Sequence, residues 1–452
     1  MIDYLYHRPV RAAELLIRGA RVIDPRTDLD EPHDILIRDG RIAELGSPGS
    51  LPAPESGEVL DGAGKHAFPG FVDPHVHLRT PGQEHKENIE TGTAAAAAGG
   101  FCAVIAMPNT SPVVDDPAVL GSLVDTARRT ARVPVGFLAS ITRGLNGQEL
   151  TEMATLRDAG ALGFTDDGKP VVSAGMLRKA LQYQRLARGV VALHEEDPAL
   201  SSDGVMHEGG VSARLGLAGI PSLSESTMLA RDAALARYEN ARVHFQHLSC
   251  VESVEALALA KEAGARVSGE ASPHHLTLTD DTIRMLDTRN KMNPPLRSET
   301  DRRALVDALV SGVIDCVATD HAPHARHEKE VPFEQAPMGT TGLETAFAAL
   351  FTDLVLPGEL ELETLIERMT AGAALYGLPT PIVKTGASAN LCVVDLGAKF
   401  EVGSHGYVSR SENCCFHGRT LQGQVVLTVA AGQVAFQAPM LAAAKVGTAA
   451  QR

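Results

Sequence analysis

Tryptophan is absent from this chain of 452 residues, and only 4% of the residues are aromatic. This scarcity leaves few side chains on which unpaired nucleic-acid bases could stack. Acidic residues outnumber basic ones by 56 to 41, and the net charge of -15 repels phosphate backbones and anionic lipid. We therefore expect no nucleic-acid partner and no association with a membrane surface.

The chain also lacks C-x-x-C spacing, a signal-peptide pattern and a long apolar run. Its first residues, MIDYLYHRPVRAAELL, contain no basic stretch followed by an apolar one. The longest run of small residues, 93–107, is too short to span a bilayer. These absences predict a reduced, cytoplasmic protein. Its six cysteines are Cys102, Cys250, Cys316, Cys392, Cys414 and Cys415.

Both ends of the chain have the pattern of β-strands, whereas the middle alternates helical segments with short apolar runs. The strand-like stretches carry Val, Ile and Leu around short turns and cover residues 14–24, 33–46, 390–402 and 425–437. This order predicts a small β-sandwich that is built from residues 1–68 and 380–452. Residues 69–379 would then form a central α/β domain.

Eight apolar runs in the middle each end in polar residues or in Gly and Pro. They are AFPGFVDPHVH, FCAVIAMPN, VPVGFLASI, ALGFTDDG, VVALHEED, VHFQHLS, RVSGEASPHH and IDCVATDHAPH. Helices are expected between them, for example over 87–98 and 253–263, where glycine follows. Eight strand–helix units predict a (β/α)8, TIM-like barrel, whose active site lies at the carboxyl ends of the strands.

His75-Val76-His77 is the sharpest local signal for a metal site. Side chains alternate along a strand, so the two imidazoles point the same way and can share one metal ion. Three other runs end in a histidine or an aspartate, namely His194, His247 and Asp320. Four imidazoles and a carboxylate exceed what one catalytic zinc needs, so we expect two metal ions. A pair of cations needs an anionic bridge, for which FTDDG offers Asp166 or Asp167.

Several motifs in order identify a resemblance to the bacterial dihydroorotases (class I type) of the amidohydrolase superfamily. They are PGFVDPHVHLRTPG, AMPNTSP, FTDDG, HEED, HLS, SPHHL, KMNPPLR and ATDHAPH, and the resemblance runs from about residue 15 to 435. It implies that His75, His77 and Asp320 hold one Zn²⁺ and that His194 and His247 hold the other. Many relatives bridge the metals with a carboxylated lysine. This chain has none at that strand end, and the resemblance implies Asp167 as the bridge.

The resemblance also implies a small cyclic amide substrate with one carboxylate. Arg79 follows the two histidines at the same spacing, so it lies on their face and can hold a carboxylate with two parallel hydrogen bonds. The family motifs imply further contacts with the substrate from Asn109, Asn293 and His324 and from the backbone around Met338 and Gly339. The metal ligand His77 is also expected to contact the substrate.

The implied reaction is the reversible hydrolysis of dihydroorotate to N-carbamoyl-L-aspartate, a step of pyrimidine biosynthesis. Two zinc ions would lower the pKa of a bridging water, and Asp320 would carry its proton to the departing amide nitrogen. Cys250 lacks a visible activating group, so we interpret it as a packing residue. The charged segment 325–339 after the eighth strand is either a lid over the site or a solvated loop.

Two alternatives remain at this point. Another cyclic amidase, such as a dihydropyrimidinase, a hydantoinase or an allantoinase, would share the barrel, although these enzymes generally use the bridging lysine. A non-catalytic dihydroorotase-like scaffold would typically have lost metal ligands. By analogy with related chains, a homodimer and a complex with aspartate carbamoyltransferase are further expectations.

Overall fold

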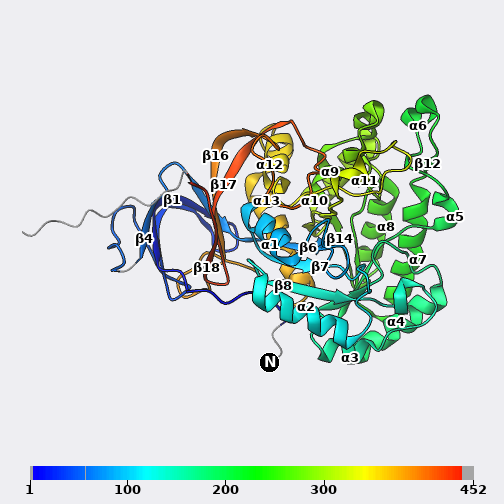
Figure 1. Ribbon diagram of the computed structural model, residues 1–452, viewed down its shortest axis with the longest axis horizontal. Coiled ribbons are helices and arrows are strands. Elements are labelled where there is room, and N and C mark those ends of the chain that lie inside the picture. The colour runs from blue at the N-terminus through cyan, green and yellow to red at the C-terminus, as the bar shows by residue number, and fades with distance from the viewer. Residues whose placement is uncertain (1–3, 56, 440–452) are drawn as a thin grey trace, which may run out of the picture.

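Two eight-stranded sheets organise the chain, and Figure 1 shows them at opposite ends of its long axis. The structure is a computed structural model that describes residues 4–55 and 57–439. Residues 1–3 and 440–452, which the sequence prediction assigned to the small domain, lie outside the described residues. Within the described part, no helix is both long and apolar enough to cross a membrane.

The first sheet is a parallel barrel whose strands are the eight runs predicted from the sequence. In spatial order they are β6 (Phe71–Val76), β7 (Phe101–Ala106), β8 (Val135–Ala139), β9 (Gly163–Thr165), β10 (Val190–Leu193), β13 (Val243–Phe245), β14 (Val267–Ala271) and β15 (Cys316–Val317). The amide of His77, just after β6, donates to the carbonyl of His321, beyond β15, at 2.9 Å. This bond joins the first and last strands, so the predicted TIM-like barrel is confirmed.

Helices cover the outside of the barrel and fill its connections. The longer ones are α1 (Ile89–Ala98), α2 (Pro117–Thr130), α4 (Ala174–Ala187), α7 (Leu223–Glu239), α8 (Val251–Glu262), α10 (Glu299–Ser311) and α13 (Leu362–Thr370). The shorter ones are α3 (Met153–Asp158), α5 (Pro198–Ser201), α6 (Gly210–Leu215), α9 (Pro273–Thr277), α11 (Arg326–Lys329), α12 (Ala346–Leu350) and α14 (Gly372–Leu375). Three 3₁₀ segments, η1 (Arg143–Leu145), η2 (Asp280–Met285) and η3 (Thr288–Asn290), and the π-helical η4 (Phe351–Val355) complete the set.

The start of α1 follows from its sequence. The Asn88 side chain accepts from the amide of Thr91, and the Thr91 side chain accepts from the Asn88 amide. This reciprocal cap satisfies two amides that have no partner inside the helix, and Gly99 ends it. The helix predicted over 87–98 therefore begins at residue 89, after its cap. The helix predicted over 253–263 is α8, which begins two residues earlier.

The second sheet joins the two ends of the chain. Its order is β18 (Gln433–Gln437), β17 (Thr420–Ala430), β16 (Leu391–Glu401), β5 (His66–Pro69), β1 (Leu15–Asp24), β2 (Leu29–Arg38) and β3 (Arg41–Gly46), and β4 (Glu58–Asp61) pairs with β1. The antiparallel pairing of β5 with β16 connects the amino-terminal and carboxyl-terminal segments. A separate small pair, β11 (Met206–His207) with β12 (Gly219–Ile220), lies in the connection between β10 and α7.

Apolar side chains from both halves of this terminal sheet pack in one core. Ile17 of β1, Ile35 of β2, Leu391 of β16 and Leu427 of β17 belong to the same buried cluster. Such a core requires the sheet to curl so that strands from both ends of the chain face one another. The small β-domain assembled from both termini is thus present, and its limits at residues 68 and 380 stay a prediction.

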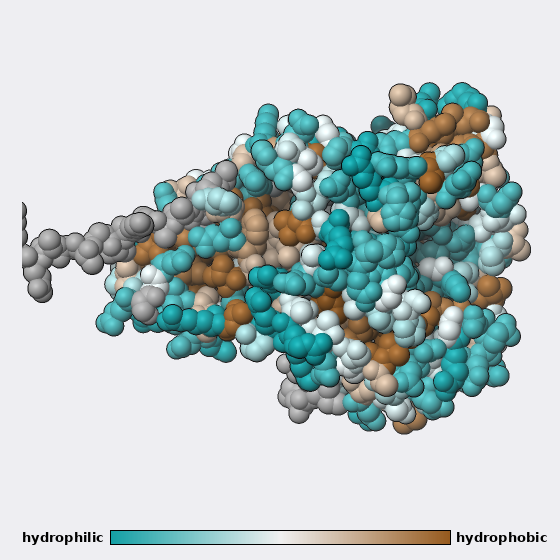
Figure 2. Space-filling model, in the orientation of Figure 1, coloured by the Kyte–Doolittle hydropathy of each residue, from teal (hydrophilic) through white to brown (hydrophobic). Residues whose placement is uncertain are grey.

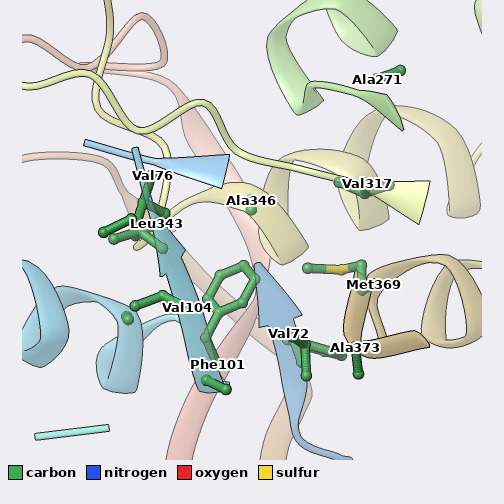
Figure 3. Packing of buried hydrophobic residues seen from close by; sticks show 14 of the residues in the cluster. Val72, Val76, Phe101, Val104, Ala271, Val317, Leu343, Ala346, Met369 and Ala373 are labelled. Atoms are coloured by element: carbon green, nitrogen blue, oxygen red, sulfur yellow. The ribbon is translucent and has the colours of Figure 1, made fainter. Parts of the chain in front are cut away.

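A larger core fills the barrel wall below the strand ends. Figure 3 shows Val72 of β6 near Met369 of α13 and Ala373 of α14, and Val76 of β6 near Leu343, with Phe101 and Val104 of β7 in the same cluster. On the face drawn in Figure 2, hydrophilic residues cover much of the outer surface of the barrel. The barrel is therefore a packed body, and the polar groups buried at its mouth are the exception that needs a functional account.

Candidate metal centre and substrate pocket

The carboxyl ends of β6 and β15 bring three of the predicted ligands together. The Nε2 atom of His77 lies 3.1 Å from Oδ1 of Asp320, and the Nε2 atom of His75 lies 3.5 Å from the same oxygen. Donor atoms of these three residues all lie within 4.8 Å of one another. The two histidines of the H-x-H motif thus point to one side, as the alternation of a strand requires.

Asp167 faces the same cluster with both of its oxygens. Oδ2 lies 3.4 Å from Nε2 of His77, while Oδ1 lies 3.4 Å from Nε2 of His75. Oδ1 also lies 3.6 Å from Nε2 of His247 and 3.9 Å from Nδ1 of His194. One carboxylate therefore stands between two sets of imidazoles, which is the position of a bridging ligand.

Asp166, the other aspartate of the FTDDG motif, points elsewhere. One of its oxygens accepts from the amides of Ile141 and Thr142, at 2.8 and 2.9 Å, and the other accepts from the Thr142 hydroxyl. These bonds hold the turn after β8 against the turn after β9. The geometry thus separates the two neighbouring aspartates into a candidate ligand and a loop-fixing residue.

The donor set fits divalent metal ions. Ligand atoms about 2.0–2.1 Å from a tetrahedral zinc lie roughly 3.3 Å from one another. The separations of 3.1 to 3.6 Å between the imidazoles of His75, His77 and His247 and the two carboxylates match that spacing. The Nε2 atom of His75 is buried and has no hydrogen-bond partner among the described residues. A metal ion would satisfy this orphaned nitrogen.

Glu270, which the sequence reading missed, lies behind His75. Its Oε1 accepts from Nδ1 of His75 at 2.7 Å, and its Oε2 contacts Nε2 of His244 at 2.9 Å. Because the outer nitrogen of His75 is engaged in this way, its Nε2 is left for a metal. Burial would raise the pKa of the Glu270 carboxyl, but the two imidazoles outweigh burial and lower it to about 2. Glu270 thus stays ionised.

Glu196 has the corresponding place behind His194. Its Oε2 lies 3.2 Å from Nε2 of His194 and accepts from Nδ2 of Asn293 at 2.7 Å. The HEED motif therefore supplies a candidate ligand and, two residues later, the carboxylate that orients it. Glutamates are frequent in any chain, and neither Glu196 nor Glu270 carries a sequence signal of its own that distinguishes it.

Electrostatics keep the two inner carboxylates ionised. Burial favours the neutral acid, but the surrounding imidazoles outweigh burial and hold the pKa of Asp167 well below its usual range. The same balance lowers the pKa of Asp320, where His77 and His75 provide the favourable interactions. For His75, burial opposes the charge, yet Asp167 and Glu270 raise its pKa well above the usual value. The cluster is therefore rich in negative charge that cations would neutralise.

A cavity of about 230 Å³ opens onto this cluster. Every residue predicted to contact the substrate lines it, and so do five of the six candidate metal ligands, with His75 lying behind them. The lining includes His77, Arg79, Asn109, Asp167, His194, His247, Asn293, Asp320, His324, Met338 and Gly339. Residues that lie up to 262 positions apart in the chain thus meet around one small space.

Arg79 is the cationic member of the cavity wall. Its Nε donates to the carbonyl of Pro323 at 3.1 Å, and no carboxylate among the described residues forms an ion pair with it. A buried guanidinium with its outer amines free of such a pair is suited to bind an anionic ligand. Burial, followed by the charge of Arg79, lowers the pKa of His324 to about 2, so this imidazole is neutral.

The other predicted substrate contacts have partners within the protein. Nε2 of His324 donates to the carbonyl of Met338 at 2.8 Å, which orients the ring. Asn109 contacts Nδ1 of His77 through Oδ1 at 2.8 Å and Oδ2 of Asp167 through Nδ2 at 3.3 Å. In this structure Asn109 thus holds two candidate metal ligands in place.

Three site residues have backbones in the left-handed region. The φ angles are 56° for Arg79, 34° for His247 and 46° for Asp320. Non-glycine residues adopt this region at an energetic cost, so the surrounding structure must hold these three backbones in place. The strand ends therefore turn sharply where the functional side chains project.

The segment 325–339 is fastened to the barrel mouth. Nζ of Lys329 donates to the carbonyls of Thr288, Lys291 and Pro337 at 2.9, 3.2 and 2.8 Å. Nζ of Lys291 donates in turn to the carbonyls of Phe333 and Glu334, both at 2.9 Å. These contacts hold part of the segment against the barrel mouth, and its role as a lid stays a prediction.

Cys250 is buried at the start of α8, and its Sγ lies 3.1 Å from Oγ of Ser253. Burial and the nearby Glu225 carboxylate raise the pKa of this thiol above its usual range. A thiol in this state is a poor nucleophile, which agrees with its interpretation as a packing residue.

Known dihydroorotases are similar to this chain over nearly its whole length. Those of Pelotomaculum thermopropionicum and Geobacter sp. (strain M21) are each 44% identical to it over 425 residues, covering 94% of this chain and 99% of either relative. The chain belongs to the dihydroorotase family. A family model described as dihydro-orotase-like also matches residues 64–255. Family membership and the buried histidine–aspartate clusters together indicate a metal-binding site.

Solved structures of related amidohydrolases share the fold of this dihydroorotase family member. L-Hydantoinase (dihydropyrimidinase) from Arthrobacter aurescens matches with a TM-score of 0.83 and 26% identity, covering 94% of this chain and 96% of that one. Dihydropyrimidinase from Brevibacillus agri NCHU1002 matches with a TM-score of 0.79 and 22% identity, covering 94% and 95%. The structural likeness supports the architecture, whereas the sequence similarity favours a dihydroorotase over the hydantoinase alternative.

Proposed function

We propose that this chain is a dihydroorotase that uses two Zn²⁺ ions to open and close the ring of dihydroorotate. One observation carries the proposal: Asp167 stands between two sets of imidazoles in a cavity that also contains Arg79. His75, His77 and Asp320 would hold one ion, His194 and His247 the other, and Asp167 would bridge them. When bound, the ions would supply Lewis-acid polarisation of the ring carbonyl and lower the pKa of a water.

Arg79 would hold the carboxylate of the substrate at the far side of the cavity, and the neutral His324 would add a contact once its Nε2–H turns from the carbonyl of Met338 to the ligand. The guanidinium provides two parallel donors in a fixed plane, and burial strengthens such a charge-assisted bond. Asn293 and the backbone at Met338 and Gly339 would fix the ring by hydrogen bonds. These residues orient the scissile amide toward Asp320 and thereby reduce the entropic cost of the reaction.

Asp320 would move the proton. Its carboxylate is ionised and lies 3.1 Å from Nε2 of His77, so it can accept a proton from an attacking water. The water oxygen bonds to the carbonyl carbon, the bond from carbon to the ring nitrogen breaks, and Asp320 returns the proton to that nitrogen. The reverse sequence closes N-carbamoyl-L-aspartate to the ring. No covalent nucleophile from the chain is needed.

Ring-opening assays of purified protein with dihydroorotate, dihydrouracil and allantoin, side by side, test this proposal. We expect turnover of dihydroorotate and at least about 100-fold lower kcat/KM for the two rings without a carboxylate, because a site built around a buried cation rejects ligands that leave it unpaired. Preference for dihydrouracil or allantoin would favour the other cyclic amidases. Absence of all turnover after zinc addition would favour the non-catalytic scaffold.

The partner of the site is therefore a small anionic molecule. A homodimer and a complex with aspartate carbamoyltransferase stay predictions, since the structure contains a single chain. The described cysteines are all free thiols, which supports the predicted cytoplasmic location.

A further inference from the structure

A loop of the terminal sheet reaches the mouth of the barrel. Residues 402–419 connect β16 to β17, and Figure 1 shows this segment, in orange to red, running from the sheet toward the barrel. The amides of Val408 and Ser409 donate to the Glu344 carboxylate at 2.9 and 3.0 Å. Oγ of Ser411 donates to the carbonyl of Lys86 at 2.6 Å. The loop is thus bonded to two separate connections of the barrel.

Asn413 is the residue of this loop that approaches the cavity. Its side chain is buried, and its Oδ1 accepts from the amide of His324 at 3.0 Å. Its Nδ2 donates to the carbonyl of Ala322 at 3.2 Å and to the carbonyl of Gly339 at 3.1 Å. One amide side chain therefore makes three hydrogen bonds to two parts of the connection that follows β15, 15 positions apart.

These two segments form facing parts of the cavity wall. Ala322 and His324 follow β15, Gly339 ends the segment 325–339, and all three line the cavity. They are closely packed, because a side chain added at Gly339 would come within 3.0 Å of Nε2 of His324 and 2.8 Å of the Ala322 carbonyl. The spacing between the imidazole and the backbone at Gly339 thus has little slack, and Asn413 bonds to both sides of it.

We propose that Asn413 is a positioning residue that sets the spacing of His324 and Gly339 for the carboxylate-bearing end of the substrate. The inference rests on the proposed function for the identity of the ligand. Asn413 does not line the cavity and contacts none of the candidate metal ligands, so it acts on substrate binding through its neighbours. The terminal sheet, which lies outside the barrel, thereby contributes to the geometry of the site.

The test compares Asn413→Asp with Asn390→Asp, the same change in the same domain. Aspartate keeps the size and the acceptor for the His324 amide but loses both donors to the carbonyls. Among the described residues, the side chain of Asn390 accepts one hydrogen bond, from the amide of Ala431 at 2.6 Å, and Asn390 does not line the cavity. Asn413→Ser provides a second variant that adds no charge.

We expect both Asn413 variants to raise the KM for dihydroorotate by about 10-fold or more, with kcat within about threefold and metal content unchanged, since a small misplacement of binding groups is costly. The Asn390→Asp control should keep the KM of the unmodified chain. Hydrogen–deuterium exchange should rise at residues 322–324 and 338–341 in the Asn413 variants alone.

An unchanged KM in both Asn413 variants, or an equal effect in the Asn390→Asp control, would overturn the positioning role. So would a fall in kcat with KM unchanged, since that pattern indicates damage to the reacting groups. The exchange measurement needs no substrate. It therefore tests whether Asn413 stabilises residues 322–324 and 338–341 even if the unmodified chain fails to turn over dihydroorotate. Lack of turnover by the unmodified chain would count against the proposed function, whereas the exchange data would still show whether Asn413 holds the two segments.

Discussion

The barrel mouth and the core of the terminal sheet are buried to a similar degree with opposite chemistry. His75 and Asp167 at the mouth are 0% and 2% exposed, and Ile17 and Leu391 in the sheet are both 0% exposed. In the sheet, removal from water is itself favourable. At the mouth, burial is unfavourable for each charged group and is offset only by its neighbours.

This difference indicates that the sheet core contributes mainly to stability and the barrel mouth mainly to function. An apolar residue of the sheet can be shortened without touching the site, so stability should fall while the chemistry of the folded protein persists. A carboxylate of the mouth is tied to imidazoles and backbone amides, so its removal should alter metal binding and catalysis far more than folding. The loop that carries Asn413 is where the two regions meet.

The largest effect should come from Asp320→Asn, which removes the group that moves the proton. We expect kcat for dihydroorotate to fall by about 10²–10⁴-fold, the usual contribution of a positioned acid or base. Steady-state kinetics measure the loss, with metal content determined on the same samples. Asp395→Asn makes the same change in the terminal sheet, and a comparable loss there would erase the contrast between the two regions.

Leu391→Ala tests the opposite side of the comparison. Truncating a fully buried leucine in the sheet core should reduce the free energy of unfolding by about 2–5 kcal/mol, because contacts are lost and a cavity remains. Urea unfolding curves measure this change. Activity per folded molecule should stay within twofold, and a specific fall in kcat at full folding would show that the sheet core is part of the catalytic machinery.

Glu270→Gln should weaken metal binding without a matching loss of stability. The amide cannot supply the negative charge that fixes His75, and loss of such an outer carboxylate typically reduces metal affinity about 10–100-fold. Competition with a chelator measures the affinity. Glu239→Gln, at the end of α7 and remote from the mouth, is the matched control. Equal metal affinities in Glu270→Gln and Glu239→Gln would show that Glu270 does not contribute to metal binding.

Lys329 should produce no effect on the reaction, and its contribution should be visible only as a pH dependence of stability. Burial lowers the pKa of its amine to about 7. Between that value and the ordinary value near 10.5, the unfolded chain binds more protons, so this group makes the unfolding free energy rise with pH. In Lys329→Met, urea unfolding across pH 7 to 10 should lack this part of the rise. Lys399→Met, at an exposed lysine, should retain it.

The sequence was most informative where a periodic pattern and a chemical motif coincide. The eight barrel strands could be predicted because each apolar run leads into polar residues, glycine or proline, and the H-x-H spacing places both imidazoles on one face of β6. The start of α1 differed by two residues because its cap, rather than apolar periodicity, decides where the helix begins. The start of α8 also differed by two residues, and no side-chain cap explains it.

The rest depended on contacts between distant segments. Glu270 and Asn413 are ordinary residues in sequence, and their roles arise from tertiary contacts with His75 and with His324. The segment 325–339 was expected to be a lid or a solvated loop because it is a long, charged connection at the barrel mouth, and that choice stays a prediction. Its Lys329 is buried against three carbonyls, a state that no charge pattern predicts.

Metal analysis of the purified protein by inductively coupled plasma mass spectrometry, paired with the dihydroorotate assay, tests the central claim most directly. The account predicts about two equivalents of zinc per chain in the unmodified protein, as its surplus of ligands requires. Asp167→Asn should lose at least one equivalent together with activity. Full dihydroorotate turnover by protein that contains no divalent metal would contradict the account.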